Sequence, residues 1–150
     1  MSTALLTDRY ELTMIDAALR DGTAARPCVF ELFARRLPGA RRFGVVAGTG
    51  RLLQELREFR FGDDELRYLR DHAVVSTETL AFLEGYRFSG TIRGYREGEL
   101  YFPGSPILTI EGTFAEAVVL ETLALSILNH DSAVATAAAR MSIAAGDRPL

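Results

Sequence analysis

The sequence contains no lysine and only one cysteine, and this scarcity of two residue types sets the first limits on what the protein does. The single cysteine, Cys28, excludes an intrachain disulfide, and no group of cysteine and histidine residues has the spacing of metal ligands. This composition fits a reducing, cytoplasmic setting. All 17 basic residues are arginine. Either codon bias in a GC-rich genome or the recognition of phosphate and carboxylate groups explains this choice of basic residue. Composition alone leaves both explanations open.

Long apolar runs and an excess of positive charge are also missing. No run approaches 18 apolar residues, and no basic segment followed by a long apolar one opens the chain, so we expect neither a membrane span nor a secretory signal. The net charge of -3 gives no argument for nucleic acid or an anionic membrane as partner. The 150 residues, 48% hydrophobic and 25% charged, are typical of a soluble globular domain with a core.

The first part of the chain predicts helices around one clear strand. Asp8 and Glu11 have the spacing of a capping box, and the helix that they open should end at Gly22. Residues 28–36 read as a strand whose even-numbered side chains share one apolar face. A leucine-rich helix follows the glycines at 48–50. Two shorter helices are predicted with Asp63 and Ser76 as their caps.

The second part predicts a small sheet followed by two helices. Three short strands are predicted at 90–96, 99–102 and 106–111. Thr113 and Glu116 form a second capping-box spacing before an apolar helix over 114–128, which should be buried on most sides because Glu116 and Glu121 are its only charges. Asp131 then caps a last helix over 132–145, so that the segment closes as a buried helical hairpin. We also expect the natural protein to continue beyond Leu150.

Four features of the sequence could carry chemistry. Gly48-Thr49-Gly50 before a helix could hold a phosphate, but its spacing matches neither the Walker nor the dinucleotide-binding fingerprint, and a structural turn is the simpler interpretation. His130 beside an aspartate could be a base, or it could lie at a helix junction. Arg35 and Arg36, with a second arginine pair shortly after, could bind phosphate or be exposed charge. Tyr10 could stack on a flat ligand or be an ordinary tyrosine.

An ordered series of short motifs runs through the chain. Residues 5–14 read Leu-Leu-Thr-Asp-Arg-Tyr-Glu-Leu-Thr-Met, and residues 30–36 read Phe-Glu-Leu-Phe-Ala-Arg-Arg. Further motifs lie at 46–48, 61–69, 85–90, 97–103, 106–112, 116–122 and 129–140. Together this series resembles the N-terminal part of nicotinate phosphoribosyltransferases over essentially all 150 residues. The order carries the resemblance, since no single motif would suffice.

The resemblance implies a fold and a reaction. The fold is α+β: an N-terminal sandwich-like α/β domain of a type II phosphoribosyltransferase over 1–112, then a buried helical segment over 113–150 leading to an α/β barrel that this sequence does not contain. The reaction joins nicotinate to the phosphoribosyl group of phosphoribosyl pyrophosphate, giving nicotinate mononucleotide and pyrophosphate in NAD salvage. It uses Mg²⁺, and ATP hydrolysis through a phosphohistidine drives it forward. Members are typically homodimers with sites built from both subunits.

The resemblance also assigns roles to four substrate-binding residues. Tyr10 would stack on nicotinate across the dimer interface, and Asp8 would lie beside it. Arg35 is the best match to the arginine near the phosphates, and Arg36 is the second choice. A lysine typical of the family is replaced by Ala137, to which we assign no role.

The phosphohistidine, the arginine for the nicotinate carboxylate and most of the phosphate site would lie beyond residue 150. We therefore predict no catalytic or metal-binding residue in this segment, and we expect the segment to be inactive alone. Two alternatives are a related phosphoribosyltransferase for quinolinate or nicotinamide, and a non-catalytic binding module.

Overall fold

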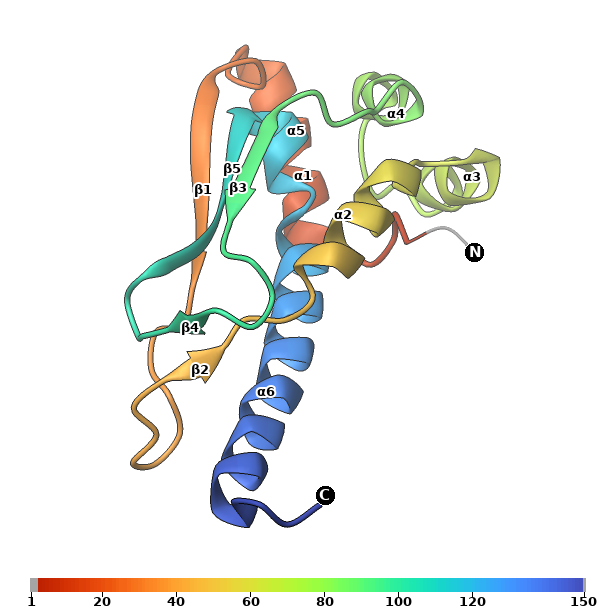
Figure 1. Ribbon diagram of the computed structural model, residues 1–150. Coiled ribbons are helices and arrows are strands. Elements are labelled where there is room, and N and C mark those ends of the chain that lie inside the picture. Colours follow the sequence, from red (N-terminus) through yellow and green to blue (C-terminus); the bar gives the residue numbers. More distant parts are fainter. Residues whose placement is uncertain (1–2, 150) are drawn as a thin grey trace.

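The structure, a computed structural model, describes residues 3–149 as an antiparallel sheet with helices on one of its faces (Figure 1). The expected mixed α and β class is confirmed. Its elements, in chain order, are α1 (Arg9–Asp21), β1 (Pro27–Phe33), β2 (Gly44–Val45), α2 (Thr49–Glu58), α3 (Asp63–Asp71), α4 (Thr77–Glu84), β3 (Thr91–Gly94), β4 (Leu100–Tyr101), β5 (Pro106–Thr113), α5 (Phe114–Val118) and α6 (Glu121–Ala145).

The main sheet has the strand order β1-β5-β3, with both pairs antiparallel. Phe30, Ile110 and Ile92 lie opposite one another in the register and share the inner face. The outer face of β1 is open, since Val29 and Phe33 are exposed. The strand predicted at 28–36 ends earlier, at Phe33, because its partner there is Pro106, which has no backbone N–H to donate.

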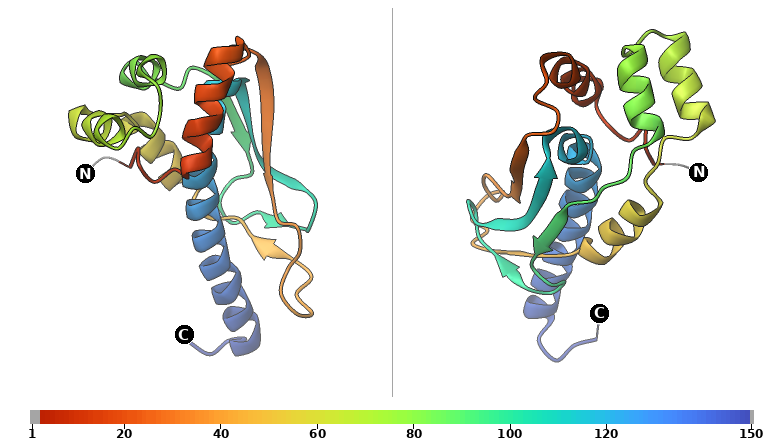
Figure 2. Two further views of the ribbon diagram at one scale, coloured as in Figure 1. Left: turned by 180° about the vertical axis from the view of Figure 1, so that it is seen from behind. Right: turned by 90° about the horizontal axis from the view of Figure 1, so that it is seen from above.

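The core lies between the inner face of the sheet and the helices, and α2, α3 and α4 contribute to it as well as α1, α5 and α6 (Figure 2). Its centre is the junction of α5 and α6, where Val118, Val119 and Leu120 are completely buried. A smaller cluster of Val46, Tyr101 and Ile107 packs beside the β2–β4 pair. Burial of the 115–124 region agrees with the apolar sequence that predicted it.

The predicted helical hairpin is wrong. The helix breaks at Val119 and Leu120, and α6 then runs without interruption for 25 residues. The hydroxyl of Ser132 accepts a hydrogen bond from Ala47 N, and that of Thr136 accepts one from Val45 N. Polar residues that suggested a new helix start instead bind the chain around β2, because helix α6 passes alongside it.

Both predicted capping boxes are wrong as well, although the helix starts were located well. Asp8 and Thr113 occupy the N-cap positions, but neither side chain accepts a hydrogen bond from its helix. Glu11 is completely buried, and its carboxylate accepts from Thr7 and Thr122 instead of closing a capping box with Asp8. By contrast, Ser76 accepts from Thr79 N as predicted, and Gly22 ends α1 in the left-handed conformation.

The stretch Phe114–Ala145 is long and apolar enough to cross a membrane by length and composition alone. Half of its most apolar window is buried inside the protein, as expected of a core helix. The C-terminal half of α6 extends beyond the other elements (Figure 2). This part is mostly exposed, including Met141 and Ile143.

Candidate functional site

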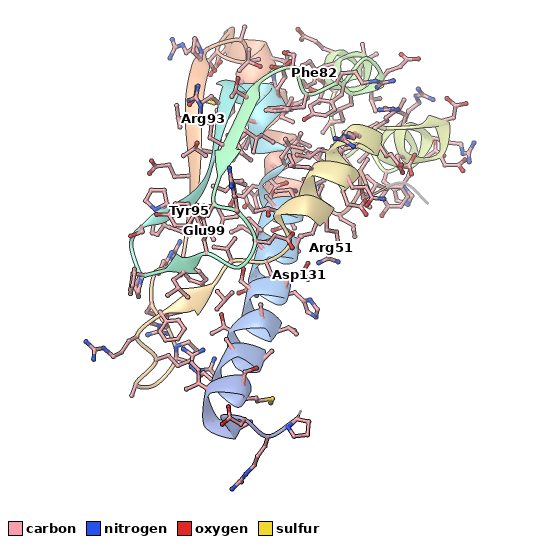
Figure 3. The ribbon with its side chains drawn as sticks, viewed as in Figure 1. Arg51, Phe82, Arg93, Tyr95, Glu99 and Asp131 are labelled. Atoms are coloured by element: carbon pink, nitrogen blue, oxygen red, sulfur yellow. The ribbon has the colours of Figure 1, made fainter. Side chains whose placement is uncertain are left out.

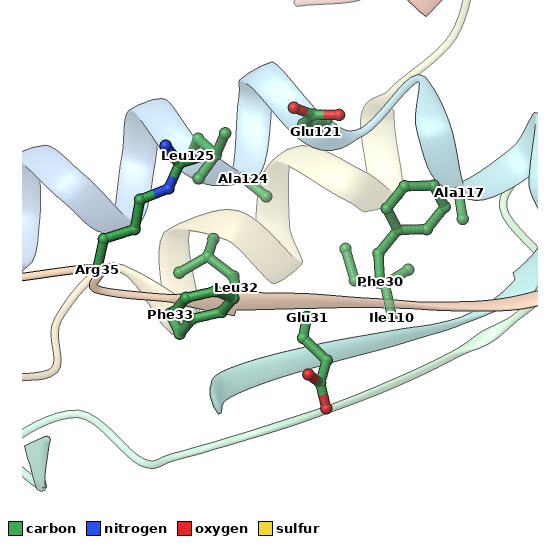
Figure 4. Close-up of a pocket in the computed structure, with 10 residues that line it drawn as sticks. All are labelled: Phe30, Glu31, Leu32, Phe33, Arg35, Ile110, Ala117, Glu121, Ala124 and Leu125. Carbon is green, nitrogen blue, oxygen red and sulfur yellow. The ribbon is translucent and has the colours of Figure 1, made fainter. Parts of the chain in front are cut away.

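A pocket opens between β1 and the first turns of α6, with a volume of about 240 Å³. Its floor is apolar, formed in part by Phe30, Leu32 and Ala124. Its charged residues include Arg35, which extends from the end of β1 toward α6, and Glu121 on α6 (Figure 4). The pocket therefore combines a flat apolar floor with a cationic end and an anionic end.

Tyr10 is connected to this pocket through Glu121. The Tyr10 hydroxyl donates to Glu121 Oε1 at 2.7 Å, while 44% of the tyrosine remains exposed. This hydrogen bond raises the pKa of the Tyr10 phenol above its usual range, and desolvation and neighbouring carboxylates add to the effect. The phenol is thus neutral at physiological pH, and its ring is held at one end with much of its surface open to a ligand.

Of the other three predicted site residues, one lines this pocket and two lie elsewhere. Arg35 lines it, whereas Arg36 is exposed and is not among the lining residues. Asp8 lines a separate cleft beside Arg51 and His130. The structure therefore places Arg35 in the same pocket as Glu121, the partner of Tyr10, and leaves Asp8 and Arg36 outside this pocket.

Glu11 and Glu121 are the residues that sequence reasoning missed. Glu11 is completely buried, and its Oε1 accepts from the backbone N of Thr122 at 3.0 Å and from the Thr122 hydroxyl at 2.6 Å. Thr7 also donates to Glu11. Glu121 had a sequence signal, as one of only two charges in an apolar helix, but Glu11 had none beyond its place in a capping pattern.

A second polar cluster joins α2 to α6 (Figure 3). Arg51 donates to both carboxylate oxygens of Asp131, at 2.8 and 3.0 Å. His130 Nδ1 lies 2.9 Å from the same carboxylate, and this contact, followed by the charge of Arg51, lowers the Asp131 pKa. The cluster fixes α2 against α6. Because α6 runs unbroken from Glu121 to Ala145, His130 lies within a helix and not at a helix junction.

The glycines at 48–50 form a structural turn. Gly48 has a φ of +96°, and a Cβ there would lie 2.9 Å from Asp131 Oδ2. The first N–H groups of α2 already have an anionic partner, because Gly50 N donates to Glu97 Oε1 at 2.9 Å. A phosphate at this helix start would have to displace the Glu97 carboxylate, which supports the structural interpretation.

Within residues 3–149, no three side chains of histidine, cysteine, aspartate or glutamate cluster closely enough to hold a metal ion. The charged groups of the pocket are one guanidinium and two carboxylates, Glu31 and Glu121. Figure 4 shows Glu31 pointing away from α6, on the other side of β1. Arg35 is thus the cation that the pocket offers to an anionic ligand.

Comparison with known proteins gives one consistent result. Residues 5–129 match the family model described as the nicotinate phosphoribosyltransferase (NAPRTase) N-terminal domain. A nicotinate phosphoribosyltransferase of Mycobacterium tuberculosis is 62% identical over 146 residues, which cover 97% of this chain and 32% of that protein. The human enzyme of the same name is 38% identical over 146 residues, covering 95% of this chain and 27% of that protein. The chain thus spans about a third of the length of the curated relatives it matches.

Solved structures agree with the sequence comparisons. The crystal structure of human nicotinic acid phosphoribosyltransferase superposes with a TM-score of 0.87 at 34% identity, covering 95% of this chain and 29% of that one. A nicotinate-nucleotide pyrophosphorylase from Pyrococcus furiosus gives a TM-score of 0.70 at 23% identity and covers 98% of this chain and 30% of that one. At this lower identity, the second similarity concerns the fold alone.

Proposed function

The chain belongs to the nicotinate phosphoribosyltransferase family, and from this premise we propose that the whole protein forms nicotinate mononucleotide and pyrophosphate from nicotinate and phosphoribosyl pyrophosphate. The observation that carries the proposal is the family match over residues 5–129, which includes Tyr10 and Arg35. The reaction is a step of NAD salvage. A phosphoribosyltransferase activity on quinolinate or nicotinamide is not favoured, since the similar proteins from bacteria and animals bear the nicotinate name.

In this reaction the ring nitrogen of nicotinate attacks the anomeric carbon of the sugar as pyrophosphate leaves. The ring must be held flat with its nitrogen aimed at that carbon, and an aromatic surface does this with little loss of freedom. We assign this task to Tyr10, whose ring is exposed and whose hydroxyl is fixed on Glu121. Tyr10 is not among the residues that line the pocket of its own chain, which supports a ring that meets a ligand held by a second subunit of a homodimer.

Arg35 is assigned to the phosphates. A guanidinium presents paired N–H donors that match phosphate oxygens, and its charge stabilises the anion that develops as pyrophosphate departs. The position of Arg35 at the opposite end of the pocket from Glu121 supports this role, because an anion would avoid the carboxylate. Arg36 does not line the pocket and is the weaker candidate. Asp8 is assigned a place beside the substrate, in the cleft between the N-terminal segment and α6.

Magnesium and ATP belong to the proposed reaction, and we assign neither of them to the residues described here. No cluster among residues 3–149 fits a metal ion, so no step of the mechanism is assigned to a metal in this segment. The segment supplies ring positioning and one cation, while the phosphohistidine and metal chemistry are proposed for a barrel domain of the whole protein.

We propose a cytoplasmic location, and a division of this segment into residues 1–112 and 113–150.

The test of the proposed function is the nicotinate dependence of the whole protein. Replacing Tyr10 by alanine should raise the KM for nicotinate at least about tenfold, because the lost ring contacts correspond to roughly 1.5 kcal/mol or more. The KM for phosphoribosyl pyrophosphate should change much less. Tyr68→Ala is the matched control, since Tyr68 on α3 has a similar exposure of 52%. An unchanged nicotinate KM in Tyr10→Ala would remove the assigned role.

A further inference from the structure

Glu11 has an unusual place for a carboxylate. It is completely buried, and its hydrogen bonds come from Thr7 and from Thr122 at the start of α6. The first turn of a helix leaves N–H groups without partners, and a polar N-cap side chain usually accepts from one of them. The N-cap of α6 is Leu120, which has no such group. Glu11 therefore caps α6 from another helix, 111 residues away in sequence.

This contact fixes the part of α1 that carries Tyr10. Tyr10 and Glu11 are neighbours in the first turn of α1, and their partners Glu121 and Thr122 are neighbours in the first turn of α6. Tyr10 binds Glu121 by its hydroxyl, at the exposed side, while Glu11 binds Thr122 in the interior. The Tyr10 ring has its hydrogen bond on the exposed side, so the adjacent buried pair is the interior polar contact that links this turn of α1 to α6.

We infer that Glu11 is a positioning residue for Tyr10. By capping the N-terminus of α6 from helix α1 of the same chain, it sets the distance between the first turns of α1 and α6 and thereby the position of the tyrosine ring. Glu11 itself touches no substrate. The inference rests on the proposed function for its kinetic consequence, but the position of the ring can be measured separately.

The kinetic test uses the whole protein and a mutant cycle. Glu11→Ala should raise the KM for nicotinate about tenfold, because a ring displaced by a fraction of an ångström loses its alignment. In the Tyr10→Ala background the same change should have no further effect on that KM, since the ring it positions is gone. Glu11→Gln should restore a near-normal KM, because the amide oxygen can still accept from Thr122. Thr122→Val, which keeps the backbone donor, should give a smaller increase in the same direction.

Asp16→Ala is the matched control for Glu11→Ala. Asp16 is also a carboxylate of α1, but it accepts from Ser76 N and the Thr79 hydroxyl at the start of α4. It anchors the same helix to a different neighbour, so its loss should leave the KM for nicotinate unchanged. An equal rise in Asp16→Ala, or an effect of Glu11→Ala that persists without Tyr10, would show that Glu11 acts only through general stability and overturn the inference.

A direct measurement of the ring separates this inference from the proposed function. With fluorinated tyrosine incorporated, the resonance of Tyr10 is identified by its absence in Tyr10→Phe. Glu11→Ala should shift or broaden this resonance, whereas Asp16→Ala should not. If the resonance moves but Tyr10→Ala does not alter nicotinate usage, the positioning role stands and the nicotinate role of Tyr10 falls. If the resonance and the KM both stay unchanged in Glu11→Ala and Thr122→Val, the positioning role falls.

Discussion

At the scale of single residues, α1 carries two anchoring carboxylates with opposite electrostatics. Desolvation raises the pKa of Glu11, against the opposing effect of its hydrogen bonds from Thr122 and Thr7. Asp16 is only partly buried, and hydrogen bonds from Ser76 and Thr79 lower its pKa from 3.8 to about 2. A carboxyl group with a raised pKa stabilises the fold most when protonated, and one with a lowered pKa stabilises it most when ionised. The two anchors should therefore respond to acid in opposite directions.

Asp16→Asn should lower the free energy of unfolding by about 1 kcal/mol near pH 7, since a depression of nearly two pKa units sets an upper limit of roughly 2.5 kcal/mol and solvent around the partly exposed carboxylate screens much of it. The lowered pKa means that this stability is present above pH 3.8 and is lost as the pH falls toward 2. Urea unfolding of both proteins at several pH values measures the difference. A difference that stays constant between pH 7 and pH 3 would show that the charge of Asp16 is not the cause.

The capping patterns show why single side chains were harder to predict than helix starts. Asp8 and Glu11 have the spacing of a local capping box, and the helix does begin where that spacing indicates. However, the spacing says nothing about a competing partner far along the chain. Thr122 offers Glu11 two donors in the core, and only the tertiary fold brings them within reach. The role of Glu11 was therefore not readable from its sequence neighbours.

At the scale of elements, the continuity of α6 depends on contacts with the chain around β2. The Ser132 hydroxyl accepts from Ala47 N at 3.1 Å and donates to Ala47 O at 3.2 Å. Ser132→Ala would leave both backbone groups of Ala47 without this partner, at a cost of roughly 1–3 kcal/mol. The better helix propensity of alanine offsets about 0.5 kcal/mol. We expect a net loss of about 1–2 kcal/mol in the free energy of unfolding.

Ser142→Ala is the matched control on the same helix, because the exposed Ser142 hydroxyl donates only to Ala138 O of its own helix. This variant should be neutral or slightly stabilising. Thermal unfolding of the two variants side by side gives the comparison. Equal stabilities would mean that α6 is held by its apolar side chains alone and not by the polar contacts with Ala47.

The same contacts explain which elements could be predicted. Strand alternation and the apolar helix over 114–128 gave the elements and the buried region correctly, because periodicity reflects burial directly. The break at Val119 and Leu120 had no signal, since both residues are apolar and neither glycine nor proline is present. The false break near Asp131 came from polar residues whose partners, Arg51 and Ala47, lie far away in sequence. Local patterns located the elements, while their ends depended on tertiary partners.

At the scale of the whole molecule, the site carries part of what the proposed reaction requires. Tyr10 offers an open ring, and Arg35 offers one cation beside an apolar floor. Glu121 places a carboxylate at the same pocket, which disfavours a second phosphate charge there. Met14 on α1 and Leu125 on α6 are also exposed. Each lies four residues after Tyr10 or its partner Glu121, so exposed apolar side chains continue along both helices, which suits contact with another protein surface.

The 150-residue chain by itself should form no nicotinate mononucleotide from nicotinate, phosphoribosyl pyrophosphate, ATP and Mg²⁺. Departure of pyrophosphate requires several positive charges around the leaving group, and the pocket supplies Arg35, with no metal-binding cluster among residues 3–149. Product formation measured by chromatography, with the whole protein as the positive control, tests this expectation. Synthesis that increases with the concentration of the 150-residue chain and falls in its Tyr10→Ala variant would contradict it. That result would mean that Tyr10 and Arg35 act in a site complete within this chain, and that no barrel domain is needed for the chemistry.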